Sequence, residues 1–291
     1  MTRNNNLSVL PWYDSIDEQN HRKSYAYGNI YPLFAPASTL LPFQIMRPSR
    51  ENRIIQAVLY DKDGRQVGGD MANDLYNASM QIVKFPDYGY DIIVFPGRLP
   101  LSTDIEDGIH YMVMYDGLQY WYSEMFTVVH NMGGFLKLEW WDEENLVFDA
   151  GRIVYQNPTF KNVLYFCAEL GKPDYEFEEE GENRDGYFFP EKQLSSKTYR
   201  FNILAPEYLC DVMRFIRLSD HVAITDKYGN EYQCDTFLMT PEWQTQGDLA
   251  GMELEFTTDT VVKKIGRAYT GDSPGQYGDF NNDFNNDFNN A

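Results

Sequence analysis

The sequence predicts a mainly β protein: an N-terminal β-sandwich-like domain followed by an α+β domain with a sheet and one short helix. Short segments in which apolar and polar residues alternate recur along the chain, with turn residues between them. The chain is also rich in residues that favour strands, with 22 Tyr and 19 Phe. The clearest helical spacing of apolar residues falls in one segment, residues 205–216.

The first domain is expected to span residues 24–130, after a flexible and polar N-terminal arm of residues 1–23. Its predicted strands cover residues 43–45, 53–60, 90–95, 110–115 and 118–129. Residues 61–64, Asp-Lys-Asp-Gly, and the Asp-Gly pair at 116–117 supply the turns. Short strands joined by such turns indicate a β-sandwich of the immunoglobulin or fibronectin type, and a small barrel is the alternative.

The second domain is expected to span residues 131–268, with residues 131–134 as the linker that precedes it. Its most regular block runs over residues 198–266. One apolar helical stripe in this block is formed by Leu209, Val212, Met213 and Ile216. Alternating strands are predicted on both sides of the stripe, at residues 198–203, 221–225, 231–238 and 252–257. The acidic run at residues 176–182 is interpreted as a solvated loop.

Both ends of the chain are predicted to be arms. Residues 269–291 hold three copies of Asp-Phe-Asn-Asn, and a four-residue repeat of this length cannot bury a core. The alternative is a tail that becomes ordered against a partner through Phe280, Phe284 and Phe288. In the N-terminal arm, Trp12 and Tyr13 form an apolar patch, which makes them candidates for contact with a neighbouring subunit.

The composition argues against several classes of function. A net charge of −20 repels phosphate groups, so we expect no direct nucleic-acid binding. No run approaches the ~20 apolar residues of a membrane span, and no apolar leader begins the chain, so we expect no membrane partner and folding in a reducing cytoplasm. Of the three cysteines, Cys167, Cys210 and Cys234, none has CxxC spacing, and the last two are interpreted as core residues.

No pattern of catalytic residues is recognisable in the chain. The four histidines are widely spaced, and the sequence has no nucleophile elbow, phosphate loop or dinucleotide fingerprint. We therefore expect no enzyme, no cofactor and no metal. Glu139, beside two indoles, is the most site-like carboxylate. The candidates for stacking on a glycan are Trp121, Tyr122, Trp140 and Trp141.

Three stretches carry a resemblance to a known group of proteins. Residues 109–129, IHYMVMYDGLQYWYSEMFTVV, and residues 136–145, LKLEWWDEEN, resemble segments of tail or minor structural proteins of phages and prophages of Bacteroidota. Residues 207–262 are similar in style to the same proteins. The resemblance covers under half of the chain and carries over no functional residue. It implies a virion component, made in the host bacterial cytoplasm, that acts as one copy in a tail, hub or portal-proximal ring.

Three hypotheses of function follow. The first is a non-enzymatic structural protein of a phage particle, whose partners are its own copies and other virion proteins. The second is an adhesin that binds host glycans through the four aromatic residues named above. The third is a glycoside hydrolase that uses Glu139. Under the first hypothesis, Trp12, Tyr13 and the charged outer faces of the 198–266 block are the candidate subunit contacts, and these faces carry Glu231, Asp235, Glu253 and Glu255.

Overall fold

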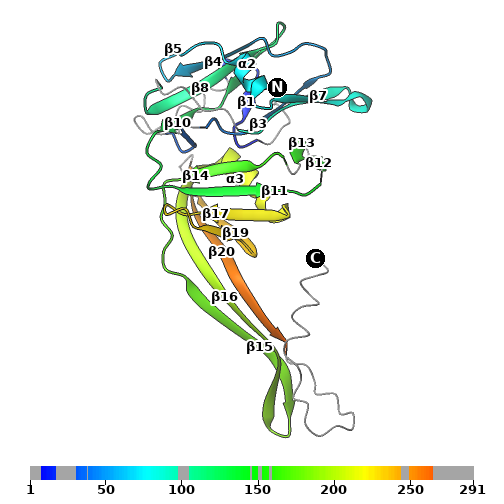
Figure 1. The fold of residues 1–291 in the computed structure, drawn as a ribbon, viewed down its shortest axis with the longest axis vertical. Helices are drawn as coiled ribbons and strands as arrows, with labels where there is room; N and C mark the ends of the chain where they lie inside the picture. Colours follow the sequence, from blue (N-terminus) through cyan, green and yellow to red (C-terminus); the bar gives the residue numbers. More distant parts are fainter. Residues whose placement is uncertain are drawn as a thin grey trace. The chain divides into compact units, whose positions relative to one another are not determined.

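Strands dominate the computed structural model, which describes residues 8–17, 31–37, 39–97, 105–144, 146–149, 153–156, 159–243 and 249–264 (Figure 1). The prediction of a mainly β chain is confirmed. Within the described residues, α3 (Glu207–Met213) is the longest helix, with seven residues. The Asp-Phe-Asn-Asn repeats and their three phenylalanines lie outside the described residues.

The contacts between residues divide the chain into two compact units. The first unit comprises Met1–Lys172 and Tyr199–Thr258, and the second comprises Pro173–Thr198 and Asp259–Ala291. The domain boundary predicted from the sequence, at residues 130–131, falls inside the first unit. Two long strands, β16 (Tyr187–Pro206) and β20 (Leu249–Lys264), contribute residues to both units.

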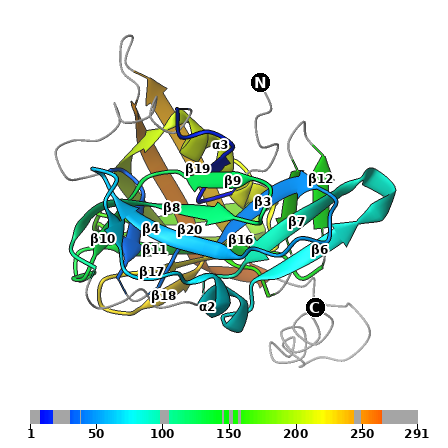
Figure 2. The same cartoon turned by 90° about the horizontal axis from the view of Figure 1, so that it is seen from above.

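The first unit begins with a seven-stranded sheet built around β8 (Gly108–Tyr115). One edge of β8 pairs antiparallel with β4 (Gln56–Asp61), and Figure 2 shows the two strands side by side. Its other edge pairs with β9 (Tyr120–Ser123) and then with β10 (Phe126–Val129). Three short strands complete the sheet: β1 (Trp12–Tyr13) on β9, β2 (Phe34–Pro36) parallel to β10, and β5 (Gln66–Val67) on β4.

A second sheet of the first unit has the strand order β3-β7-β6. Its strands are β3 (Phe43–Pro48), β7 (Tyr90–Phe95) and β6 (Gln81–Phe85), all antiparallel. The central strand β7 ends in an apolar run, Ile92 to Phe95, that is buried on both faces, which is why it lacks the alternation of the other strands. Two short helical segments precede and follow β6, namely α2 (Ala72–Asn77) and the 3₁₀ turn η2 (Pro86–Tyr88).

A third sheet of the first unit has the order β14-β11-β17-β18. Its strands are β14 (Asn162–Phe166), β11 (Leu136–Trp141), β17 (His221–Thr225) and β18 (Glu231–Gln233). A separate hairpin is formed by β12 (Leu146–Asp149) and β13 (Ile153–Gln156). The apolar and polar residues of β11 alternate, so Leu136, Leu138 and Trp140 are buried and the residues between them are partly exposed.

The helical stripe predicted from the sequence is confirmed. Leu209, Val212 and Met213 of α3, with Ile216 of the 3₁₀ turn η3 (Ile216–Leu218), are all buried in the core. Pro206 precedes the helix as its N-cap residue. The neighbouring strands β19 (Thr236–Trp243) and β20 pair antiparallel, and β20 buries Met252, Leu254 and Phe256 as the alternation predicts.

The main hydrophobic core of the first unit joins residues from Val9 to Phe256. It includes Val9, Leu10 and Trp12 of the N-terminal segment, which are all at most 3% exposed. The prediction of a flexible arm over residues 1–23 is therefore wrong for residues 8–12, because their apolar side chains belong to this core. Residues 1–7 and 18–23 lie outside the described residues.

The main element of the second unit is a long β-hairpin, beside which the unit holds the end of β20. Here β15 (Asp174–Arg184) pairs antiparallel with the first part of β16 over eleven register positions, with one irregularity between Glu180 and Gly181. Asp185 and Gly186 form the two-residue turn, with φ of 51° and 82°. Positive φ at both positions is what a type I′ hairpin turn requires. The interpretation of the acidic run as a loop is wrong, because these residues form the strand β15.

Candidate functional site

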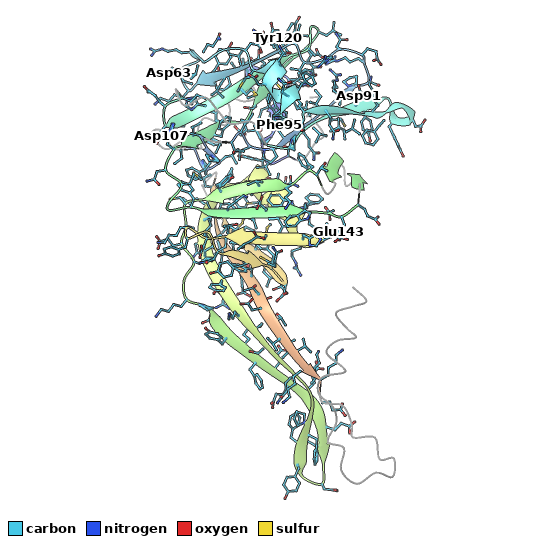
Figure 3. All side chains as sticks on the ribbon, in the orientation of Figure 1. Asp63, Asp91, Phe95, Asp107, Tyr120 and Glu143 are labelled. Atoms are coloured by element: carbon cyan, nitrogen blue, oxygen red, sulfur yellow. The ribbon has the colours of Figure 1, made fainter. Side chains whose placement is uncertain are left out.

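The second unit presents five exposed aromatic side chains, which we call the aromatic hairpin. Tyr175 is 73% exposed and Phe177 is 63% exposed, both on β15. The other three follow the turn on β16, where Tyr187, Phe188 and Phe189 are 70%, 47% and 50% exposed. Figure 3 draws the side chains along this hairpin. Large apolar side chains that gather in solvent are typical of surfaces that bind proteins, membranes or ligands.

Strand alternation separates the side chains of β15 onto two faces. Tyr175 and Phe177 lie on one face, where their cross-strand partners are Lys197 and Ser195. The opposite face of β15 carries four carboxylates, from Asp174, Glu176, Glu178 and Glu180. The first part of the hairpin therefore has one aromatic face and one acidic face.

A glycine at the strand irregularity allows the two backbones to approach closely. A Cβ added at Gly181 would overlap the backbone oxygen of Phe189, so a larger residue would displace one of the strands. The bulge falls between the acidic part of β15 and the tip of the hairpin. The bulge inserts one extra residue in β16. The faces on which Phe188 and Phe189 lie therefore do not follow from the alternation of the residues beyond the bulge.

Neutralisation of the acidic face is incomplete within the hairpin. Glu180 lies 3.6 Å from Lys192, and Glu179, on the aromatic face, accepts a hydrogen bond from the side chain of Gln193. Among the residues that the structure describes, neither Glu176 nor Glu178 has an ion pair or a hydrogen bond through its side chain. Residues 174–183 are exposed along the whole strand. On one face the hairpin therefore exposes carboxylates without a partner among the described residues, and on the other it exposes aromatic rings.

The charged faces predicted as subunit contacts belong to the first unit. Glu231, Asp235 and Glu253 are exposed, and Glu255 is partly buried in an ion pair with Arg200. Glu253 also lines a pocket of about 580 Å³ whose apolar walls include Leu249, Met252 and Leu204. Their role in subunit contact stays a prediction.

The N-terminal aromatic pair, predicted as a subunit contact, is largely covered by its own chain. Trp12 is 3% exposed and packs on Phe43, with ring centroids 4.9 Å apart. Tyr13 is partly buried, and its hydroxyl donates a hydrogen bond of 2.9 Å to Glu124. The prediction is wrong for Trp12, because its side chain is already covered by its own chain.

The residues predicted to stack on glycans are mostly covered. Trp121 and Trp140 are 0% and 1% exposed, so the prediction that these two indoles face solvent is wrong. Trp141 is half-buried, stacked on His221 with centroids 5.1 Å apart and covered by the ammonium group of Lys161 at 3.7 Å. In β11 the alternation places Trp140 on the same inward face as Leu136 and Leu138, and the glycan hypothesis did not take this into account.

Tyr122 belongs to a row of stacked tyrosines. Tyr115 and Tyr120 have ring centroids 4.3 Å apart, and Tyr120 and Tyr122 have centroids 6.5 Å apart. Tyr120, labelled in Figure 3, is the most open of the three, at 47% exposed. We call these three residues the tyrosine row.

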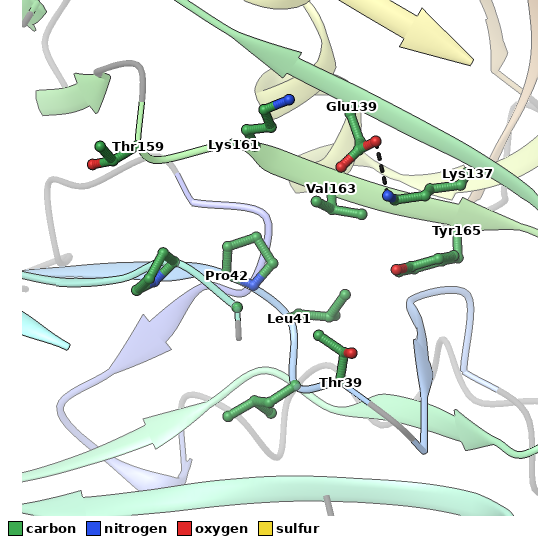
Figure 4. Close-up of a pocket in the computed structure, with 12 residues that line it drawn as sticks. Thr39, Leu41, Pro42, Lys137, Glu139, Thr159, Lys161, Val163 and Tyr165 are labelled. Atoms are coloured by element: carbon green, nitrogen blue, oxygen red, sulfur yellow. Dashed lines mark ion pairs between the residues drawn. The ribbon is translucent and has the colours of Figure 1, made fainter. Parts of the chain in front are cut away.

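A pocket of about 230 Å³ lies beside Glu139 in the first unit (Figure 4). The carboxylate of Glu139 is held by the ammonium group of Lys137 at 2.8 Å. Burial, and then the charge of Glu139, raise the pKa of Tyr165 to about 12, so this phenol stays protonated. Among the described residues that line this pocket, Glu139 is the one acidic residue. Because hydrolysis of a glycoside ordinarily uses two carboxylates, the pocket gives the hydrolase hypothesis no second partner.

A buried ionic cluster connects β3, β7 and the β8–β9 turn. The guanidinium of Arg47 lies 2.8 Å from Asp116 and 3.8 Å from Asp91, and all three side chains are 0% exposed. Arg50 also contacts Asp116 at 2.6 Å and stacks over Trp121. Burial lowers the pKa of Arg47, and the two carboxylates oppose this shift. Every acid of the cluster has a partner, so we interpret the cluster as a structural link between β3, β7 and the β8–β9 turn.

The described part of the chain holds no group of three His, Cys, Asp or Glu residues that could bind a metal ion. Cys210 is buried and Cys234 is partly buried, and burial raises their thiol pKa values to about 11 and about 12. Such thiols are poor nucleophiles. The interpretation of Cys210 as a core residue is confirmed.

The aromatic hairpin is the feature that the sequence analysis missed. Two signals for it were present: the alternating Asp-Tyr-Glu-Phe-Glu at residues 174–178 and the Asp-Gly pair at residues 185–186. The interpretation of the run as a loop rests on its consecutive like charges, which are usually solvated.

No protein family model and no curated protein sequence matches this chain. Over the described residues, none of the helices combines the length and the apolar character needed to cross a membrane.

Proposed function

We propose that this chain is a non-enzymatic structural component of a phage particle, a tail, hub or portal-proximal protein that assembles with its own copies and with other virion proteins. The observation that carries the proposal is the aromatic hairpin, with five aromatic side chains between 47% and 73% exposed on one β-hairpin. Aromatic residues are enriched at protein interfaces and supply much of their binding energy. An isolated subunit gains nothing from holding them in water.

The extended form of the hairpin supports assembly over catalysis. Eleven residues of β15 span roughly 35 Å at about 3.3 Å per residue. A hairpin of this length offers a partner more contact surface than a short surface loop does. The resemblance of residues 109–129, 136–145 and 207–262 to phage structural proteins supplies the kind of particle, and the particle in turn implies assembly in the host cytoplasm.

The proposal is tested with the full chain and a variant that carries Tyr175→Ser and Phe177→Ser. A matched control carries Tyr88→Ser and Tyr228→Ser, which remove two rings that are 74% and 79% exposed in the first unit. Native mass spectrometry measures the oligomeric state, and co-purification with the proteins of the particle measures assembly. We expect the hairpin variant to lose both and the control to keep them. A parent chain that is strictly monomeric and binds no virion protein contradicts the proposal.

The tyrosine row favours a second candidate function, recognition of a host glycan by the same particle protein. Stacked, partly exposed rings on a sheet face are a surface on which a sugar ring can pack, and Tyr120 is the most open of them. A glycan array probed with the parent chain and with Tyr120→Ala tests it. Hits that disappear in the variant support this function, and an array without hits removes it.

A further inference from the structure

The outer edge of β15 is an open strand edge with a chemical pattern. In the four-stranded order β15-β16-β20-β19, β15 is a terminal strand, and β16 is its one neighbour among the described residues. Alternate residues of such a strand direct their backbone N–H and C=O groups away from the sheet. The regular ladder from Asp174 to Glu180 has seven positions before the bulge, enough for a strand of ordinary length to pair with it.

From this edge we infer that β15 binds, by strand addition, a segment of another virion protein that has basic residues on one face and apolar residues on the other. This inference rests on the proposed function and specifies the partner. A strand added to β15 places its own side chains beside those of β15 on the same two faces. Lysine or arginine then meets Glu176 and Glu178, and apolar side chains meet Tyr175 and Phe177.

Charge distinguishes this partner from two alternatives that the chain itself could supply, a second copy of β15 and its own C-terminal segment. A second copy of β15 would bring carboxylates against carboxylates, because residues 173–198 hold eight acidic and three basic residues, a net charge of −5. The C-terminal segment, residues 265–291, holds four acidic residues and one basic residue, a net charge of −3. Both are repelled by the acidic face of β15, whereas a basic strand is attracted to it.

The two glutamates at the centre of the edge are the residues on which the partner's charge acts. Glu176 and Glu178 are exposed and, among the described residues, have no cation beside them. Acidic residues on an edge strand also protect it from pairing with like strands. If Glu176 and Glu178 only protected the edge, β15 would bind no strand preferentially. The experiment below distinguishes this protective role from the binding of a basic strand.

The test uses the full chain and three labelled synthetic peptides in fluorescence anisotropy. The first is Lys-Val-Lys-Phe-Lys-Val-Lys, the second has the same composition in the order Lys-Lys-Lys-Lys-Val-Phe-Val, and the third replaces each lysine of the first by glutamate. We expect the alternating basic peptide to bind about tenfold more tightly than the rearranged one, since only the first matches both faces of β15. Hydrogen exchange is expected to slow at residues 174–180 when it binds.

Charge reversal identifies the residues responsible. The double variant Glu176→Lys with Glu178→Lys should bind the alternating basic peptide about tenfold more weakly and gain affinity for the acidic peptide. The matched control, Glu231→Lys with Glu253→Lys, makes the same change of net charge on the first unit and should keep the preference.

Several outcomes overturn the inference. One is equal binding of the two basic peptides, or an equal loss of affinity for the alternating basic peptide in both double variants. Either result shows general charge attraction. Another is binding only after residues 265–291 are removed, which shows that the chain's own C-terminal segment occupies the edge. A third is protection of residues 174–180 from hydrogen exchange in an oligomer of the parent chain alone, which assigns the edge to a second copy. If the Glu176→Lys, Glu178→Lys variant still co-purifies with the particle while Tyr175→Ser with Phe177→Ser does not, the inference fails and the proposed function stands.

Discussion

Single residues hold the sheets of the first unit together through a buried network of charges. Arg47 on β3 meets Asp91 on β7 and Asp116 in the β8–β9 turn, so one guanidinium connects two sheets. Asp116 also accepts hydrogen bonds from the backbone N–H groups of Leu118 and Gln119, which shape the turn itself. Charges taken out of water in this way are stabilising only while each keeps its partners.

Asp116→Asn tests the network, because it preserves one acceptor oxygen for the turn and removes the negative charge. Arg47 and Arg50 then remain beside each other with Asp91 as the one remaining carboxylate. We expect a loss of about 3 kcal/mol in the free energy of unfolding, which urea denaturation measures. Asp63→Asn, in an exposed turn, should change stability by less than about 0.5 kcal/mol. A neutral result for Asp116→Asn would show that the cluster contributes little.

Thiol reactivity reports the burial of the three cysteines. Cys167 is exposed, whereas burial raises the pKa values of Cys210 and Cys234 to about 11 and about 12. At pH 8 the two raised pKa values leave almost no thiolate, which is the reacting form. We expect one fast equivalent with a disulfide reagent in the folded protein, and three after unfolding in guanidinium. The fast equivalent should disappear in Cys167→Ser, and its persistence would contradict this assignment.

At the scale of the element, the β15–β16 hairpin depends on the close approach of two backbones at its bulge. Gly181→Ala places a methyl group against the backbone of Phe189, so part of the ladder must separate. We expect hydrogen exchange of the amides of residues 182–184 to rise about tenfold or more, while the first unit keeps its protection. Gly171→Ala is the matched control, because nothing lies within 4 Å of its added Cβ. Unchanged protection in Gly181→Ala would show that the bulge adapts at no cost.

Elements with a buried face were predictable from the sequence, and those without one were not. The stripe of Leu209, Val212, Met213 and Ile216 and the alternation of β11 and β20 follow directly from the need to bury one face. The hairpin buries little, so its sequence carries acidic and aromatic residues that alternate without an apolar core pattern. The burial of Trp12 was not predicted, because the polar sequence of the N-terminal segment gives no information on the distant strand β9 with which it pairs.

For the whole molecule, net charge and exposed aromatic residues act in opposite directions on assembly. A charge of −20 makes copies of the chain repel one another, while the aromatic hairpin offers apolar surface to cover. The Debye length falls from about 30 Å at 0.01 M salt to about 8 Å at 0.15 M, so salt weakens the repulsion between copies and leaves apolar contact intact. The same salt weakens the attraction of a basic strand to Glu176 and Glu178.

We therefore expect sodium chloride to separate the two kinds of contact. Between roughly 0.01 M and 0.15 M salt, the fraction of homo-oligomer in sedimentation should rise, because screening reduces the mutual repulsion of the copies. Over the same range, the affinity for Lys-Val-Lys-Phe-Lys-Val-Lys should fall, because it depends on attraction between opposite charges. Tyr175→Ser with Phe177→Ser should abolish the rise in oligomer, whereas Tyr88→Ser with Tyr228→Ser should keep it. If the oligomer instead dissociates as salt is added, ion pairs between copies stabilise it and the aromatic hairpin does not. The exposed carboxylates of Glu231 and Glu253 could form such ion pairs.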